Sequence, residues 1–335
     1  MRHLLLTLAL SVTAFSLPAS AATIKIATLS PEGSMWMKTM REANKEIKSK
    51  TQGRVKFRFY PGGVMGNDKA VLKKIRFGQL HGAAFSGGAL ATKAPDTQVY
   101  NLPRLFNSYA EVDYVRKHMD TSVEADFEKA GFVNFGLAEG GFAYLMSKKQ
   151  IVEAGKLKEN RVWVPSDDPA SDAASAAFEL SPTPLSLGDV LAGLQTDLID
   201  SVFASPIAAI ALQWHTQVKY ITDLPLVYFY AILAIDQKAF KKISAEDQAI
   251  VNTVMRKAFN KIDKQNRKDN EAAFIALQQQ GIEMLDLTPA QTAGWNERTL
   301  DATKRFIDIK GGVTSPVYEK AQKLLMEYRS QQAGQ

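Results

Sequence analysis

The stretch ATIKIATLSPEGSMWMKTMREANKEIKSKTQG (residues 22–53) decides the fold class of this chain. Polar and apolar side chains alternate over residues 23–27, which predicts a strand, and the loop signal SPEG (residues 30–33) ends it. An apolar stripe at helical spacing follows, formed by Met35, Met37, Met40 and Ala43. A strand, a loop and a helix in this order form the unit from which α/β proteins are built.

The same rhythm continues after the first helix. RVKFRFYPGG (54–63) predicts a second strand, and Asn67 is placed to cap the helix that follows it. QLHGAAFSGGALA (79–91) predicts a third strand that ends at glycines. This β-α-β-α-β order predicts an α/β domain with a mainly parallel sheet.

The pattern restarts in the second half of the chain. FVNFGLAEGGFAYLMS (132–147) predicts a strand, a turn and a strand, RVWVP (161–165) predicts a short strand, and LVYFYAILAI (226–235) is an apolar, strand-forming run. The remainder is rich in predicted helix. The expected helix starts are Ser186, Ser205 before Pro206, Ser244 with Asp247, and a capping box from Thr288 to Gln291.

The N-terminus has the features of a secretory signal peptide. An apolar run over residues 4–17 follows Arg2 and His3, and small residues precede a cleavage site that we expect after Ala21. We therefore expect a periplasmic protein, and no second long apolar segment predicts a membrane span. The chain has no cysteine, so the remaining stretch of about 314 residues must be stabilised by a hydrophobic core rather than by disulfides.

No catalytic, metal-binding or cofactor-binding signature is found in the sequence. The net charge of +6 is spread along helical stretches, which predicts a solvated surface rather than a nucleic-acid site. The three histidines beyond the leader, His81, His118 and His215, do not share metal-ligand spacing. The paired acids of SDDP (166–169) favour a helix N-terminus over acid–base catalysis. We therefore expect a protein that is not an enzyme and carries no metal or cofactor.

Several stretches, taken in order, resemble the solute receptors of tripartite ATP-independent periplasmic (TRAP) transporters of the dicarboxylate-receptor type. They are ATLSPEGSMWMKTM, VKFRFYPGGVMGND, GQLHGAAFSGGALA, NLPRLFNS, RVWVPSDDP, SPTPLSLGDVLAGLQTDLID and FKKIS. The resemblance implies a two-domain fold of the periplasmic-binding-protein kind, with a hinge, a ligand cleft and a helix-rich C-terminal part. It also implies a small-molecule ligand, membrane subunits as partners and transport driven by an ion gradient.

The resemblance suggests a division of the chain. After the signal peptide (1–21), domain I would comprise residues 22–145 and 233–282, and domain II would comprise residues 146–232 and 283–335. Ligands of open α/β sheets bind at the carboxyl ends of strands. The loops that follow predicted strands would therefore line the cleft, namely those at 29–36, 61–67, 85–88, 138–142, 163–169 and 202–206.

Three residues depart from the pattern that the resemblance implies. Trp163 occupies the position where most such receptors carry an arginine that pairs with the ligand carboxylate, and Arg161 lies two residues away on the same strand face. Phe203 lies where some receptors hold a carboxylate that bridges the ligand through a metal. Arg104, in NLPRLF, replaces a residue that is usually apolar, so it is either a relocated anion anchor or a cation that faces solvent or pairs with an acid.

These departures predict a pocket that is more apolar and aromatic than is usual for such receptors. The ligand would be a small aromatic, aliphatic or amphipathic molecule. Two alternatives stay open: a receptor for a C4-dicarboxylate or another organic acid that uses a relocated arginine, and a secreted enzyme that uses the cleft. The candidate ligand-binding residues are Trp36, Phe85, Arg104, Glu139, Arg161, Trp163, Phe203, Gln213, Trp214 and Tyr228.

Overall fold

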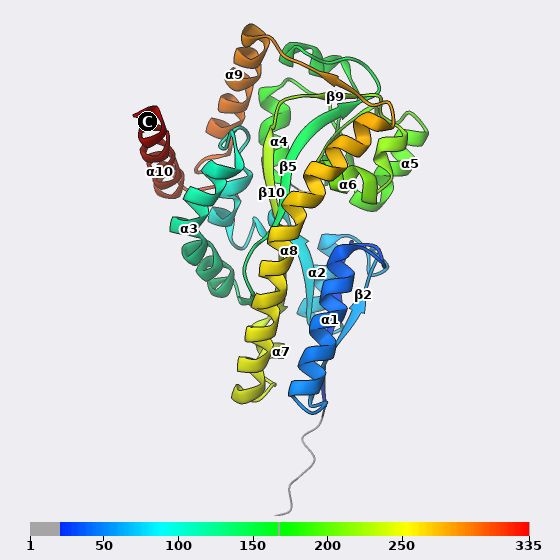
Figure 1. Ribbon diagram of the computed structural model, residues 1–335, viewed down its shortest axis with the longest axis vertical. Coiled ribbons are helices and arrows are strands. Elements are labelled where there is room, and N and C mark those ends of the chain that lie inside the picture. Colours follow the sequence, from blue (N-terminus) through cyan, green and yellow to red (C-terminus); the bar gives the residue numbers. More distant parts are fainter. Residues whose placement is uncertain (1–20, 167, 335) are drawn as a thin grey trace, which may run out of the picture.

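The computed structural model describes residues 21–166 and 168–334, so the predicted signal peptide lies outside the described residues except for Ala21. Figure 1 shows an elongated molecule in which two lobes lie one above the other. We call the lobe that contains residues 22–86 the first lobe, and the lobe that contains residues 163–222 the second lobe. The predicted α/β class is confirmed.

The first lobe follows the predicted order. β1 (Ala22–Ala27) pairs in parallel with β2 (Val55–Tyr60) on one side and with β3 (Gly82–Ser86) on the other. α1 (Met35–Lys50) and α2 (Asp68–Arg76) connect them. Asn67 accepts a hydrogen bond from the backbone N–H of Ala70, as its predicted capping role requires. The loops that follow these parallel strands therefore share one edge of the sheet.

The large sheet runs through both lobes and is mixed, so the expectation of a mainly parallel sheet is wrong beyond the first lobe. Its order is β11-β9-β5-β10-β3-β1-β2, with β4 paired to β10 and β8 paired to β5. The two long strands, β5 (Ala138–Ser147) and β10 (Val227–Asp236), run antiparallel to each other, and β10 is antiparallel to β3. The shorter strands are β4 (Phe132–Val133), β8 (Ser201–Ala204), β9 (Tyr220–Thr222) and β11 (Glu283–Leu285).

The range 138–142, expected as a cleft loop, lies inside β5. The glycines that suggested a turn instead lie within a continuous strand, where Gly141 has a positive φ. A strand can continue through such positions because the partner strand β10 carries an irregularity at the same level, between Phe229 and Tyr230.

The second lobe begins with a small parallel sheet of β6 (Trp163–Pro165) and β7 (Thr183–Leu185). The strand predicted at 161–165 is thus present but short. Its helices are α4 (Pro169–Ala177), α5 (Val190–Gln195) and α6 (Pro206–Ala211). Ser186 and Ser205 occupy N-cap positions as predicted, but neither makes a side-chain capping hydrogen bond. The 3-10 helices of the molecule are η1 (Gly87–Leu90), η2 (Pro95–Asn101), η3 (Ala154–Glu159), η4 (Leu187–Asp189) and η5 (Trp214–Thr216).

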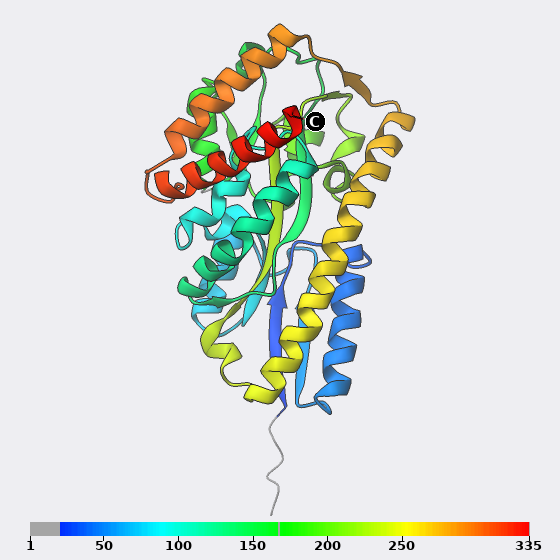
Figure 2. The same ribbon diagram turned by 60° about the vertical axis from the view of Figure 1, so that its left-hand side comes forward.

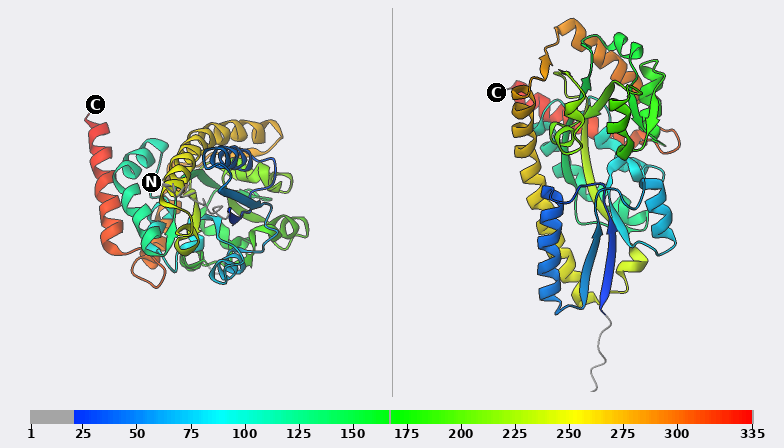
Figure 3. Two further views of the ribbon diagram at one scale, coloured as in Figure 1. Left: turned by 90° about the horizontal axis from the view of Figure 1, so that it is seen from below. Right: turned by 90° about the vertical axis from the view of Figure 1, so that its right-hand side faces the viewer.

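Long helices tie the lobes together. α8 (Ala245–Gln279) has 35 residues and packs against α1 at one end, β5 in its middle and α6 at the other end (Figure 3). Ser244 caps it by accepting a hydrogen bond from Asp247 N–H, as predicted. The short α7 (Gln237–Phe240) precedes it. Within the described residues no helix is long and apolar enough to cross a membrane.

The C-terminal helices contact elements of both lobes. α9 (Pro289–Phe306) begins with the predicted capping box and packs on α4, whereas α10 (Ser315–Ala333) packs on α3 (Tyr109–Lys129) and η2 (Figure 2). Ala321 and Leu325 of α10 share one buried cluster with Val112 and Val115 of α3. The assignment of residues 283–335 to domain II stays a prediction, and these contacts place its last helix against α3.

Candidate functional site

The two lobes meet where η1 faces the loop between β6 and α4. A Cβ atom added to Gly88 would lie 3.3 Å from Oδ1 of Asp168 and 3.7 Å from Oε1 of Gln98. Gly88 follows β3 in the first lobe, and Asp168 follows β6 in the second lobe. Each loop leaves the carboxyl end of a strand, which is the edge at which α/β sheets bind ligands. This interlobe contact is therefore the candidate ligand site.

Asp168 combines a structural role with an unsatisfied atom. Its Oδ2 accepts hydrogen bonds from the backbone N–H of Ser171 at 3.3 Å and from the Ser171 hydroxyl at 2.5 Å, so it caps α4 as SDDP predicted. Its Oδ1 is buried and has no hydrogen-bond partner. Burial raises the pKa of the Asp168 carboxyl, and the Ser171 hydrogen bonds oppose that rise. An orphaned buried acceptor costs free energy unless another group donates to it.

A second, half-buried acid lies at the same edge of the first lobe's sheet. Asp68 is the first residue of α2, just after the loop that leaves β2. That loop is held against the loop after β1 by hydrogen bonds from Gly62 N–H to Ser30 O and from Gly63 N–H to Thr28 O. Burial raises the pKa of Asp68 to about 6. The carboxyl ends of the strands thus carry acids whose protonated form is favoured by desolvation.

The strands that join the lobes contain a bend. Gly141 of β5 has φ +88°, and a Cβ there would lie 2.5 Å from Nδ2 of Asn270 on α8. The opposing strand β10 shifts register between Phe229 and Tyr230. Asn270 also donates to Gly140 O and accepts from Ile207 N–H, so it links α8, β5 and α6 at this level. Only glycine fits both the positive φ and the close approach of α8.

Glu139, next to this bend, is fully paired. It is 1% exposed, and its carboxylate accepts from Nη2 of Arg267 at 2.7 Å and from Nε of Arg267 at 3.1 Å. The Tyr228 hydroxyl donates to it at 3.3 Å. Burial raises the pKa of Glu139, and the hydrogen bonds from Arg267 oppose that effect. Arg267 also pairs with Asp113 and lies over the Tyr109 ring.

Arg116 of α3 extends the same network. Its Nη1 contacts Asp263 Oδ1 at 3.1 Å and the Tyr228 hydroxyl at 3.2 Å, and its Nε contacts Asp120 Oδ2 at 3.1 Å. Its side chain is only 11% exposed. Glu139, Tyr228, Arg116 and Arg267 therefore join β5, β10, α3 and α8 by charged hydrogen bonds. We call these four residues with Asp263 the hinge network.

Trp163, the residue expected in place of the usual arginine, lies in the core of the second lobe. It is 5% exposed, its indole N–H donates to Leu185 O at 3.1 Å, and its ring packs edge-to-face on Trp214 at 5.2 Å. Both tryptophans belong to one buried cluster with Val190 and Ala209. Arg161 points elsewhere: it is exposed and pairs with Asp200 at 3.3 Å.

The other predicted site residues lie in separate regions. Tyr228 is buried with Glu139 in the hinge network, whereas Phe85 is buried in the first lobe and Phe203 packs at the edge of a second-lobe cluster. Trp36 packs edge-to-face on Phe259 of α8 at 5.4 Å. Gln213 is exposed at a left-handed turn with φ 61°. The structure thus brings Trp163 to Trp214 and Tyr228 to Glu139, and it does not gather the ten residues around one cavity. Their ligand roles stay predictions.

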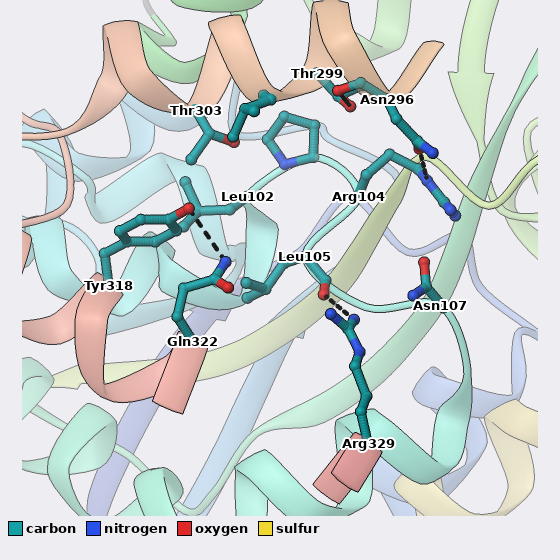
Figure 4. A pocket seen from close by; sticks show the side chains of 12 residues that line it. Leu102, Arg104, Leu105, Asn107, Asn296, Thr299, Thr303, Tyr318, Gln322 and Arg329 are labelled. Atoms are coloured by element: carbon teal, nitrogen blue, oxygen red, sulfur yellow. Dashed lines mark hydrogen bonds between the residues drawn. The ribbon is translucent and has the colours of Figure 1, made fainter. Parts of the chain in front are cut away.

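Arg104 lines a cavity of about 280 Å³ between the 102–107 segment, α9 and α10 (Figure 4). Its Nε donates to Asn296 Oδ1 at 3.0 Å, and its Nη1 donates to Pro225 O at 3.0 Å. Its backbone is left-handed, with φ 56°. No residue of the interlobe contact lines this cavity.

Sequence reasoning missed the partners of these residues. Arg116 and Asp120 are four residues apart on one helix, a detectable pair, but Asp263 and Arg267 come from α8 and are distant in sequence. Asp68 gave no signal because burial alone shifts its pKa. Over residues 21–166 and 168–334, no group of three or more His, Cys, Asp or Glu side chains could hold a metal ion.

Known proteins resemble this chain over most of its length. The sequence profile of the family described as "Bacterial extracellular solute-binding protein, family 7" matches residues 26–308. A "Solute-binding protein" of Verminephrobacter eiseniae is 26% identical over 250 residues, which is 72% of each chain. The "Ectoine/5-hydroxyectoine-binding periplasmic protein" of Ruegeria pomeroyi is 24% identical over 261 residues, covering 75% of this chain and 76% of that protein.

A solved structure shares the fold. The TRAP periplasmic solute-binding protein of Xanthobacter autotrophicus Py2, with bound β-D-galacturonate, superposes with a TM-score of 0.81 at 16% identity. The match covers 90% of this chain and 99% of that one. The predicted two-domain fold is confirmed by this likeness.

Proposed function

Because the chain belongs to the bacterial extracellular solute-binding proteins of family 7, the receptors of TRAP transporters, we propose that it is a periplasmic receptor which binds a small organic ligand between its lobes. It would present the ligand to the membrane subunits of the transporter. The receptor would release its ligand chemically unchanged.

The observation that carries the ligand proposal is the buried Oδ1 of Asp168, which lies between the lobes without a hydrogen-bond partner. A ligand hydroxyl or ammonium group that donates to this oxygen would remove its desolvation cost. Such a bond would exist only when the lobes are close, because Gly88 of the opposite lobe borders the same oxygen. Ligand binding would therefore select the closed arrangement.

The proposed ligand is a small organic acid or zwitterion that also carries a hydrogen-bond donor. Hydroxy acids, sugar acids and cyclic zwitterions belong to this class, and an unsubstituted dicarboxylate such as succinate does not. Two of the similar proteins, one named for ectoine binding and one solved with bound galacturonate, support the class, whereas a third, from Sulfurospirillum deleyianum, was solved with bound succinate. Trp163 and Trp214 would form an apolar wall behind the site, in keeping with their edge-to-face packing.

Closure would use the bend in β5 and β10. Gly141 supplies a backbone conformation that other residues avoid. The register shift in β10 interrupts the regular strand pairing opposite Gly141. Hinge motions in binding proteins are absorbed by a few such positions. α8 packs against elements of both lobes and would limit the direction of the motion.

The experiment is native mass spectrometry of receptor purified from a periplasmic extract, followed by thermal-shift titration with glucuronate, ectoine and succinate. We expect a co-purified small molecule, recovered unchanged, and stabilisation by glucuronate or ectoine in excess of succinate. Asp168→Asn should weaken the best ligand by about tenfold or more, because an amide group replaces a charged acceptor. The matched control is Asp172→Asn, an exposed acid on the same helix.

Each outcome has one consequence. If succinate stabilises most and Asp168→Asn binds it normally, the donor-bearing ligand class is wrong and the receptor role stands. If no small molecule co-purifies and no organic acid or zwitterion stabilises the protein, the receptor role itself is contradicted. Trp163→Phe should keep most of the ligand affinity, and Trp163→Arg should lose it. Unchanged affinity of Trp163→Arg would contradict the proposal that Trp163 borders the ligand site.

A further inference from the structure

The cavity that contains Arg104 is a built polar site away from the interlobe contact. It is lined by the 102–107 segment, by α9 and by α10 (Figure 4). Two of its lining residues, Arg104 and Arg329, are charged, and both are cations; the other described lining residues are neutral. Its volume of about 280 Å³ lies just below the usual range for small-molecule sites, which suits a guest of only a few atoms.

Arg104 has no carboxylate partner among the residues the structure describes. Its guanidinium group donates to an amide oxygen of Asn296 and to the carbonyl of Pro225, and both acceptors are neutral. The residue is held in a left-handed conformation, and its backbone N–H donates to Leu226 O at 2.7 Å. Half-buried arginines are usually neutralised by an acid, since desolvating a charge is costly.

The charges around the cavity leave one positive charge in excess. Arg329 forms a bidentate pair with Glu111, at 2.7 and 3.0 Å, and the backbone N–H of Asn107 donates to the same carboxylate. Glu111 is therefore hydrogen-bonded to Arg329, and it acts on Arg104 through its charge rather than through a direct hydrogen bond. Asn107 and Asn296 carry side-chain amides that can donate to a guest, and Figure 4 shows Asn107 between the two guanidinium groups in that view.

We propose that this cavity binds a small organic monocarboxylate through Arg104. The planar fork of a guanidinium matches the two oxygens of a carboxylate. A single excess positive charge favours a singly charged guest over a phosphate or sulfate dianion, which would leave the site negative. The guest would connect the first-lobe segment 102–107 to α9, which packs on α4 of the second lobe.

The test is a titration of the full-length receptor with sodium acetate at constant ionic strength, followed through the arginine Nε–Hε signals in NMR spectra. We expect one arginine signal, absent from Arg104→Gln, to shift saturably with millimolar affinity. Arg104→Gln should bind acetate at least about tenfold more weakly, since it loses a charge-assisted pair. Gln and Arg should both tolerate the left-handed backbone at residue 104 to a similar degree, so the variant tests the loss of the charge. Arg305→Gln on the exposed side of α9 is the control.

A crystal of the receptor soaked in acetate locates the guest. Density between Arg104 and Asn107 supports the proposal, whereas acetate at the interlobe contact alone overturns it. Sulfate or phosphate that binds more tightly than acetate overturns the monocarboxylate class, and equal acetate affinity of Arg104→Gln overturns the site. The proposal does not depend on the proposed function: acetate should bind Asp168→Asn as it binds the unmodified receptor.

Discussion

Glu139 is a buried acid and Asp168 is a half-buried acid with one buried oxygen, and the two differ in how they are satisfied. Burial raises the pKa of each. Both oxygens of Glu139 accept from Arg267, and Tyr228 adds a third donor. Asp168 uses one oxygen to cap α4, and its other oxygen has no partner.

The difference distinguishes an acid that stabilises the fold from an acid that is available to bind a ligand. A buried charge whose acceptors are all satisfied holds its surroundings in place and has little to offer a ligand. A buried acceptor without a donor is a site where something else must donate, and it lies where one lobe touches the other. A raised pKa does not distinguish the two acids, whereas the presence of a buried oxygen without a donor does. Substitutions should therefore act in opposite directions at the two positions.

The largest effect is expected from Arg116→Met. It removes the cation that faces Asp120, Asp263 and Tyr228, and leaves two carboxylates uncompensated. The free energy of unfolding should fall by about 3 kcal/mol, as when one partner of a buried ion pair is deleted. Urea denaturation monitored by circular dichroism measures it. Arg256→Met, at an exposed pair with Glu124, is the control and should change stability by less than about 1 kcal/mol.

Glu139→Gln should reduce the free energy of unfolding by about 2 kcal/mol. The NH₂ group of the glutamine would face an N–H donor of Arg267 at the place where a carboxylate oxygen now accepts. The same denaturation experiment applies, with Glu42→Gln at the exposed pair with Lys261 as the control. A variant as stable as the parent would mean that Arg267 is satisfied by Asp113 alone, and that the hinge network contributes no stability through Glu139.

Asp68 should make stability depend on pH. Its carboxyl group keeps its proton up to about pH 6 when folded but ionises near pH 4 when unfolded. The folded state therefore binds more protons in this window, and stability should fall as pH rises from about 4 to about 6. We expect a loss of about 1.5 kcal/mol, which is half of the full linkage value because the side chain retains some contact with water. The difference between the parent and Asp68→Asn across this window isolates the effect, and identical pH profiles would contradict the shift.

Asp168→Asn should stabilise the ligand-free receptor by about 1 kcal/mol at neutral pH. It removes the desolvated charge and keeps a side chain that caps helices well. Thermal unfolding without ligand measures the change, beside the loss of ligand affinity described above. A stabilised receptor that binds less well would sharpen the contrast with Glu139. Destabilisation would instead show that Asp168 is satisfied in solution.

Much of the fold could be predicted because its signals are local. The alternation of residues 23–27 and the caps at Asn67, Ser244 and Thr288 each lie within a few residues of the element they specify. The wrong prediction of a loop at 138–142 also has a local cause. Paired glycines in a sequence favour a turn, and only the neighbouring α8 and β10 show that Gly141 bends a strand.

The sequence by itself determined the α/β class, the family and the position of Asp168 at a helix start, since these depend on periodicity, ordered motifs and short-range hydrogen bonds. Tertiary structure alone decided which polar groups are satisfied. Arg267 reaches Glu139, and Asp263 reaches Arg116, from a helix more than a hundred residues away in sequence. It also placed Trp163 in the hydrophobic core of the second lobe and Arg104 at a separate cavity, because burial and charge pairing are properties of the assembled lobes.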